Sequence, residues 1–345
     1  MGTRMKRGAM PMGRLAIKIV TFLAVVLGAW WWVATNGLVA GMNAWLEDRR
    51  SEGLQIEVAD ISRHGFPLKI ASSLTDMQLT DPQTASRVDI PKVTVSTPIY
   101  WPGDATITLP ATPITFASPH ATLTFSSSGA TAAMRLHPGT ALQLEALKAE
   151  SSQVSLDLVE GRVLAIEDIQ IDVLQTTDEQ TYDIDLTADG FAPGSIIRQS
   201  LGLPVSWPAA FETLVADMTV TFDRPWDKSA LEHTRPQPTA IKIDQINAAW
   251  ADLNIFASAD LQVAQGGIPS GTFTLKAQNW QRMLDVATTS GAMNADMRAQ
   301  AESILGLLAG LSGNADTLDV EITIDQGRMR MGFVPLGNAP RIILR

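Results

Sequence analysis

The chain has 345 residues, with 26 Lys and Arg against 36 Asp and Glu, and a formal net charge of −10. It has no cysteine, which excludes disulfides, thiolate metal sites and cysteine nucleophiles from its own side chains. Residues 1–34 hold five of the basic residues and no acidic one, which leaves a formal charge of −15 on the remainder. Such an acidic body is repelled by nucleic acid, so a nucleic-acid partner is not expected.

The stretch Leu15–Ala34 reads LAIKIVTFLAVVLGAWWWVA and contains a single charge, Lys18. Twenty helical residues span about 30 Å, the thickness of the hydrocarbon core of a bilayer. Lys18 lies close enough to the start of the span to extend its ammonium group to the lipid headgroups. Trp30, Trp31 and Trp32 lie near the other end, where indoles favour the membrane interface. We expect a transmembrane helix with Lys18 and the three tryptophans as anchor residues.

Two alternatives to an anchor fit this segment less well. A cleaved signal peptide has a shorter apolar core followed by a small-x-small cleavage site. A buried helix of a soluble protein normally has one polar face. Before the span, Arg4, Lys6, Arg7 and Arg14 form a basic stub at residues 1–14, and the positive-inside rule keeps this end in the cytoplasm. The bulk of the chain is then expected on the other side of the membrane.

Residues 35–53 form a helical neck after the anchor. Large side chains recur at helical spacing from Leu38 to Arg49, and Gly53 is placed as a C-terminal stop. We expect this segment to continue the membrane helix or to form a short amphipathic helix at the membrane surface.

From Leu54 onward the hydrophobic period changes to two, which predicts half-buried strands. The strands repeat about every ten residues between turns rich in Pro, Gly, Ser and Asp, a pattern typical of antiparallel meanders. The predicted fold class is therefore mainly β: an N-terminal transmembrane helix, then a large antiparallel sheet assembly with a few amphipathic helices near the C-terminus. The clearest apolar face is carried by Ile169, Ile171, Val173, Ile184 and Leu186.

Helices are few after the neck. One short helix is expected at Ser195–Leu201, a second begins with Asn279 as N-cap and ends near Gly291, and a third runs from about Asn294 to Gly313. The chain then ends with a hairpin that turns at Asp325-Gln326-Gly327.

Residues 224–238, rich in proline and charge, interrupt the alternation. They mark either a boundary between a β lobe at 54–223 and a second β lobe with two helices at 239–345, or one long loop in a continuous sheet.

The histidines His64, His120, His137 and His233 are isolated along the chain, with no His-Glu-x-x-His and no close pair. We interpret them as surface or turn residues. The sequence also has no Gly-x-Ser-x-Gly and no Ser-x-x-Lys. No catalytic residue, cofactor site or metal site is therefore predicted.

Three carboxylates, Asp183, Asp185 and Asp189, alternate with apolar residues along one strand. Paired carboxylates can serve general acid–base chemistry when they line a cleft. Their alternation instead places them on the solvated face of the strand, which is the interpretation we favour.

The most distinctive short motif is a turn at Gly65, Phe66 and Pro67. Gly65 permits a positive φ, and Pro67 fits the first residue of a strand because it has no backbone donor. We expect this turn to bring the aromatic ring of Phe66 into the core.

That turn and the segments ASADLQVAQGGIPSGTFTLKAQNW and QGRMRMGFVPLGNAPRI, in this order, resemble an alphaproteobacterial envelope family, domain of unknown function 2125 (DUF2125). The resemblance covers most of the chain after the anchor. It implies a single-pass protein of the inner membrane with its bulk in the periplasm, and it brings no catalytic residue. The anchor and the long β region are also similar in architecture to AsmA-like lipid-transport proteins, which is an analogy only.

An apolar sheet face must be covered by helices, by a second sheet or by a ligand. One hypothesis is that this face binds or conducts a lipid or another apolar envelope molecule. The alternative is a non-enzymatic scaffold or partner-binding protein of an envelope complex, in which the same face is a closed core. An enzyme is the least expected of the three.

Overall fold

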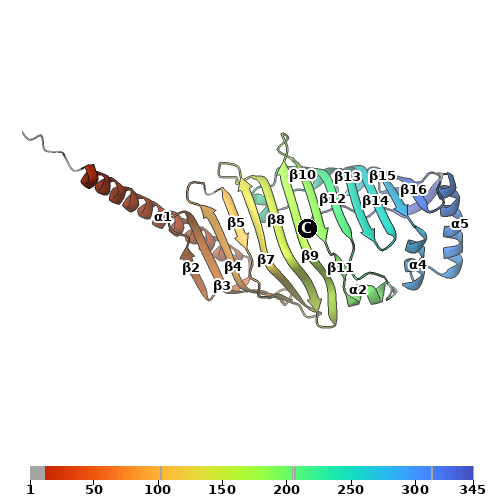
Figure 1. Ribbon diagram of the computed structural model, residues 1–345, viewed down its shortest axis with the longest axis horizontal. Coiled ribbons are helices and arrows are strands. Elements are labelled where there is room, and N and C mark those ends of the chain that lie inside the picture. Colours follow the sequence, from red (N-terminus) through yellow and green to blue (C-terminus); the bar gives the residue numbers. More distant parts are fainter. Residues whose placement is uncertain are drawn as a thin grey trace, which may run out of the picture.

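The computed structural model describes residues 12–101, 103–203, 205, 207–232, 234–311 and 314–344. It begins with a 40-residue helix, α1 (Met12–Ser51). The neck therefore continues the apolar span without a break, as in the first of its two predicted forms. The N-terminal half of α1 projects away from the body, and its C-terminal half lies against the body (Figure 1). Arg4, Lys6 and Arg7 lie outside the described residues.

After α1, the described chain forms one antiparallel sheet of 18 strands, which confirms the predicted mainly β fold. The first nine strands are β1 (Gln55–Glu57), β2 (Asp60–His64), β3 (Lys69–Asp81), β4 (Ser86–Pro98), β5 (Asp104–Thr108), β6 (Ile114–Ala117), β7 (Thr122–Leu136), β8 (Leu144–Leu158) and β9 (Gly161–Gln175). The others are β10 (Thr181–Asp189), β11 (Ala192–Pro193), β12 (Thr213–Phe222), β13 (Pro238–Trp250), β14 (Leu253–Ala264), β15 (Ile268–Gln278), β16 (Thr317–Asp325), β17 (Arg328–Met331) and β18 (Val334–Asn338).

The sheet is a meander in which most strands pair with their neighbours in sequence. The short strands β5 and β6 both lie between β4 and β7, and each pairs with both of them. The two-residue strand β11 pairs with β9, as β10 does. β12 pairs directly with β13 along almost its whole length. Residues 224–237 are thus a connection between two adjacent strands, and the sheet continues across the segment that the sequence marked as a possible boundary.

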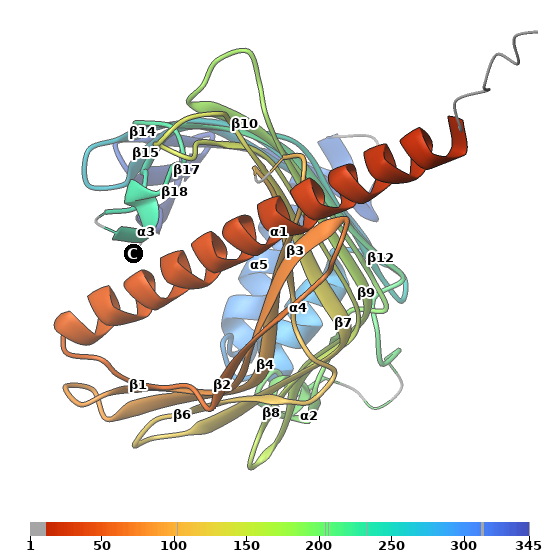
Figure 2. The same cartoon turned by 90° about the vertical axis from the view of Figure 1, so that its left-hand side faces the viewer.

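The sheet curls into a trough, seen end-on in Figure 2, with α1 on its concave side. Four shorter helices accompany it: α2 (Ser195–Ser200), α3 (Ser229–Glu232), α4 (Gln281–Thr289) and α5 (Ala295–Leu311). The predicted helices at Ser195, Asn279 and Asn294 correspond to α2, α4 and α5, and the predicted final hairpin is β16–β17. Asn279 was wrongly expected to cap α4, since the cap is Trp280 and the Asn279 amide instead donates to Asp252 O.

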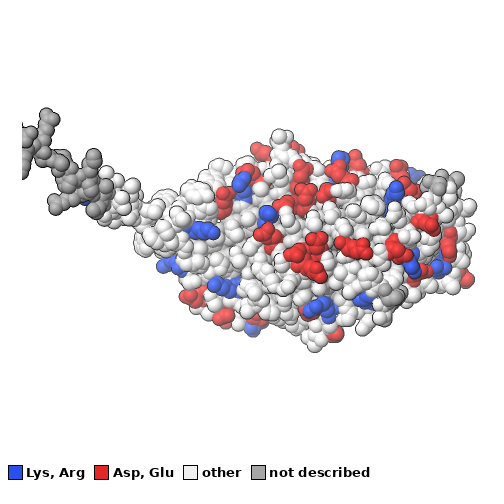
Figure 3. Space-filling model, in the orientation of Figure 1, with Lys and Arg blue, Asp and Glu red and all other residues white. Residues whose placement is uncertain are grey.

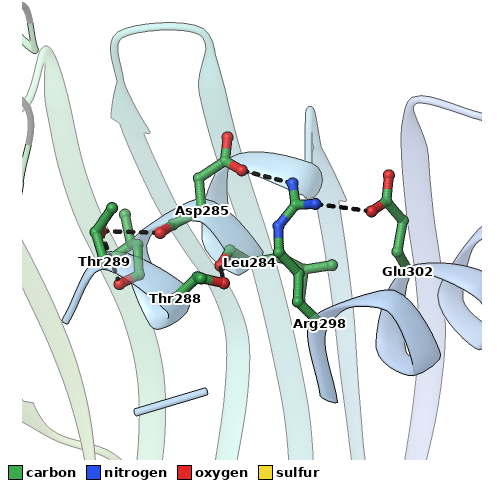
Figure 4. A network of polar contacts seen from close by, with 7 residues as sticks. Leu284, Asp285, Thr288, Thr289, Arg298 and Glu302 are labelled. Atoms are coloured by element: carbon green, nitrogen blue, oxygen red, sulfur yellow. Dashed lines mark hydrogen bonds and ion pairs between the residues drawn. The ribbon is translucent and has the colours of Figure 1, made fainter. Parts of the chain in front are cut away.

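Helices close both ends of the concave side. At the first end, Leu46 of α1 is buried against Ile56, Leu74 and Met77 of β1 and β3. At the far end, the α4 cap Trp280, Leu284 of α4 and Ala309 of α5 are buried on β15 and β16. α4 and α5 are also joined by Arg298, whose guanidinium lies 2.6 Å from Asp285 and 3.0 Å from Glu302 (Figure 4). The middle of the trough lies between these two helical caps.

Candidate functional site

The candidate site is a row of apolar side chains that crosses the concave face of the sheet. The register places one residue from each of ten paired strands directly opposite the next: Val95, Ile107, Ala132, Ala149, Ile171, Leu186, Ala216, Ile246, Ala257 and Leu275. We call this set the apolar row. It crosses nine inter-strand spacings from β4 to β15, and at about 4.8 Å each it is roughly 43 Å long.

A second row runs beside it, two residues along each strand except β13, where a bulge makes the offset three. Its members are Ala105, Met134, Leu147, Val173, Ile184, Met218, Ile243, Ala259 and Phe273. The same face also carries Ile169, opposite Ala188. The structure thus places all five residues of the sequence-predicted face, Ile169, Ile171, Val173, Ile184 and Leu186, on the concave side of the trough.

The centre of the apolar row is only partly buried. Ile107, Ile171, Leu186 and Ile246 all keep some solvent exposure, and among the described residues none of them belongs to a buried core cluster. A hollow of about 230 Å³ is lined by part of this row, including Ile107, Ala149 and Ile171. Ile107 and Ile171 thus line a hollow, and Leu186 and Ile246 continue the partly exposed row beyond it.

The second row is more covered than the first. Val173 and Ile184 pack beside buried Tyr182, Val220 and Phe222. Further along, Ile243 and Phe273 pack with Ile342 of the C-terminal segment, which is held by a 2.8 Å hydrogen bond from Ile342 N to Gly267 O. The exposed apolar strip is therefore narrow and runs lengthwise along the trough.

The convex face has the opposite character. Lys148, Asp172, Asp185, Asp217 and Gln245 lie opposite one another across five strands. Figure 3 shows acidic side chains gathered over the middle of this face. Asp183 and Asp189 are exposed on the same side of β10 as Asp185, as the alternation predicted. A polar hollow of about 380 Å³, lined by Ser152, Asp168 and Asp189 among others, lies on this face.

Asp185 is exposed, but the neighbouring strands take some water from its carboxyl; this desolvation raises its pKa, and the carboxylates of Asp217, Asp172 and Asp183 raise it further. A raised pKa means that the fold favours the protonated form, so this site stabilises the protein below the ordinary carboxyl pKa of 3.8 and the benefit is lost as the pH rises. We expect Asp185→Asn to increase the free energy of unfolding at pH 7 by about 0.5 kcal/mol, with the gain vanishing below pH 4. Thermal unfolding across this pH range tests it. The control is Asp60→Asn, an exposed strand carboxylate that lies opposite Thr75 rather than another acid, and an equal gain there would contradict the assigned cause.

The histidines are scattered in the structure. His64 and His120 are exposed, and His137 Nε2 lies 2.6 Å from Gln175 Oε1. His233 lies outside the described residues. Within the part of the chain that the structure describes, no group of three His, Asp or Glu side chains is arranged to hold a metal ion.

A second distinctive region lies where α1 leaves the body. Trp31 Nε1 donates a 2.7 Å hydrogen bond to Lys69 O, and Trp30 Nε1 donates to Ile99 O at 3.4 Å. The Phe66 ring meets the Trp31 ring edge-on at a centroid distance of 5.5 Å. Our expectation that Phe66 enters the core was wrong, because its side chain is 58% exposed and packs on the helix. The turn instead holds α1 against the sheet.

Gly65 is required at this turn. Its φ is +98°, and a Cβ there would lie 2.7 Å from Lys69 O, the acceptor of the Trp31 indole. We expect Gly65→Ala to lower the free energy of unfolding by about 3 kcal/mol, since it combines backbone strain with displacement of that carbonyl. The matched control is Gly53→Ala, where φ is +100° but no atom lies within 4 Å of the added methyl, so only the backbone cost of about 1 kcal/mol is expected. Equal losses in thermal melts of the two variants would contradict the clash.

Taken together, these features define a β-rich protein with one N-terminal helix, Lys18–Ser51 in its described part, that is long and apolar enough to span a membrane. The chain belongs to the DUF2125 family, described as uncharacterized protein conserved in bacteria, whose model matches residues 31–340. The match begins at Trp31 and includes the trough, which confirms the resemblance seen in the sequence. No curated protein matches the chain.

Proposed function

We propose that this protein is a non-enzymatic, membrane-anchored envelope protein that binds a lipid acyl chain, or a similar apolar molecule, along the concave face of its sheet. The observation that carries the proposal is the apolar row, whose central side chains stay partly exposed in a closed-ended trough. Exposed aliphatic groups aligned in a concave surface are typical of sites that bury an apolar ligand.

The dimensions agree with such a ligand. Each leaflet contributes about 15 Å, half of the roughly 30 Å hydrocarbon core. The apolar row is about 43 Å long, enough for more than one acyl chain end to end. An acyl chain needs no hydrogen-bond donors, which agrees with the aliphatic character of this strip. The AsmA-like analogy points to the same class of ligand.

For the anchor, we propose a single span in the inner membrane with the bulk of the chain in the periplasm. The support is the basic stub before α1, the length and hydropathy of the helix, and the tryptophans at its outer end. A periplasm-active reporter fused after Arg345 is expected to be active, and activity of only a cytoplasmic reporter at that position would overturn the orientation.

Photo-crosslinking tests the lipid proposal directly. The full-length protein is reconstituted in vesicles of phosphatidylethanolamine and phosphatidylglycerol that carry a diazirine in the acyl chain, and the adducts are mapped by mass spectrometry. We expect adducts on Ile171, Leu186 and their neighbours in the apolar row, in addition to those on α1. Adducts confined to α1 would count against a ligand in the trough.

A second function, partner binding, is supported by the sheet edge. Among the described strands β18 pairs only with β17, and Phe333 beside it is 95% exposed. An open edge of this kind can receive a strand of another protein. If no lipid adduct forms in the trough and a photo-crosslinker at position 333 captures another protein, the scaffold function would be favoured over lipid binding.

A further inference from the structure

Two loops beside α1 expose large apolar side chains at the level where the helix leaves the body. Leu68 in the β2–β3 turn is 71% exposed, and Tyr100 after β4 is 81% exposed. With Phe66, Trp30 and Trp32, which are also exposed, they form a group that we call the collar. An exposed apolar group of this size needs an explanation, since it normally marks a contact surface.

The collar is rigidly held. Ile99 N donates a 3.1 Å hydrogen bond to Leu68 O, which ties the two loops to each other. Thr97 Oγ1 donates to Trp101 O at 3.0 Å, and Lys69 N donates to Gly65 O at 2.9 Å, so each loop is also closed internally. The indole hydrogen bonds of Trp30 and Trp31 fix both loops to the helix. The collar therefore keeps its apolar side chains exposed in a defined position.

The length of the helix sets the depth of the collar. If the hydrocarbon begins at Leu15, Trp31 lies about 24 Å along the helix, roughly 6 Å short of the far boundary. If it begins at Met12, where α1 starts, Trp31 lies about 28 Å along, close to that boundary. Tilting the helix lowers its rise across the bilayer and places the collar deeper. In each case the loops that contact Trp30 and Trp31 meet the lipid interface.

The charges around the collar fit the same surface. Arg63 and Lys69, on either side of the turn, are exposed cations suited to anionic headgroups. Figure 3 shows basic side chains, with some acidic ones among them, at the end of the body nearest α1, while most acidic side chains gather over the middle of the convex face. The turn therefore places two cations beside the exposed aromatic rings, away from the main acidic surface.

We propose that the collar inserts into the outer interface of the bilayer that α1 spans, with Leu68 and Tyr100 among the lipid headgroups and upper acyl chains. The membrane contact is then a helix plus two loops, which fixes the direction of the trough relative to the membrane plane. This inference rests on the proposed anchor and is independent of what the trough binds.

The absence of cysteine allows single-site labelling. Leu68→Cys and Tyr100→Cys in the full-length protein each receive an environment-sensitive fluorophore and are reconstituted in vesicles of phosphatidylethanolamine and phosphatidylglycerol. Val25→Cys on α1 reports the anchor itself, and Phe333→Cys, at the far end of the sheet, is the exposed control. Lipids spin-labelled near the headgroup or deep in the acyl chain then serve as quenchers.

We expect the labels at 68 and 100 to lose emission with the shallow quencher and the label at 25 to lose it with the deep one, while the label at 333 stays unquenched. Quenching at 25 with labels at 68 and 100 that behave like the label at 333 would overturn the collar and leave the anchor intact. No quenching at 25 would overturn the anchor and the collar with it.

Discussion

Replacing Ile171 and Leu186 together with asparagine is expected to remove lipid from the trough while the protein stays folded. The two side chains lie directly opposite each other at the centre of the apolar row. The double variant removes two aliphatic side chains that would contact the ligand. This weakens the free energy of ligand binding by about 3 kcal/mol, or roughly a hundredfold in affinity. The stability cost is smaller than for core residues, because both side chains retain solvent exposure in the unliganded fold.

The matched control lies on the same two strands. Gln170 and Thr187 also face each other across β9 and β10, but they lie on the convex side. Gln170→Asn with Thr187→Asn introduces the same residue type at the same depth in the sheet without touching the trough. The measurement is mass spectrometry of the lipids that co-purify with each variant and with the unaltered protein. Lipids bound around α1 are expected in the unaltered protein and in both double variants. A difference in the amount of co-purified lipid therefore reports lipid in the trough. Equal amounts of lipid in the two double variants would contradict the proposal.

Hydropathy and periodicity were sufficient to predict the long apolar helix, the strands and the solvated face of the sheet. After Lys18, α1 has no charged residue before Glu47, and the alternation of Asp183 and Asp185 with Ile184 places the acids and the isoleucine on opposite faces of β10. The helices α4 and α5 were visible as apolar stripes between Gly and Asn signals. These features depend only on residues within a few positions of one another, which a sequence records directly.

The apolar row could not be read in the same way. A period of two says which residues share a face, whereas the row depends on register, which pairs Ile107 with Ala132 and then Ala132 with Ala149. The curvature of the sheet, which makes this face concave, depends on the cumulative twist of many strands and on bulges such as the one in β12–β13.

Phe66 was misplaced for a similar reason. Its turn chemistry was recognised, but its partner Trp31 is 35 positions earlier and belongs to the helix. Leu68 and Tyr100 were missed altogether, because a single apolar residue in a loop carries no sequence signal of exposure. Their significance comes only from their position beside the helix.

Replacing Trp280 with alanine is expected to cause the largest loss of stability of any change considered. Trp280 is 2% exposed and is packed among Ala277, Leu284 and Ala309. Its indole nitrogen donates a 3.1 Å hydrogen bond to Ala315 O, which ties the start of α4 to the segment before β16. Truncating a fully buried tryptophan costs about 3–5 kcal/mol, because it leaves a cavity and, here, an orphaned carbonyl.

Trp280→Ala should destabilise α4 and α5 in particular, as well as the whole fold, because these helices pack on the sheet through this cluster. Hydrogen exchange in α4 and α5 is expected to accelerate before that of β7–β10, which would open the far end of the trough while its centre stays ordered. Met283→Ala is the matched control: the residue lies three positions after Trp280, in α4 itself, and its side chain is 37% exposed. It should cost no more than about 1 kcal/mol. Similar melting temperatures for the two variants would mean that the cap does not depend on the indole, and the Arg298 bridge between α4 and α5 would then be the contact to remove next.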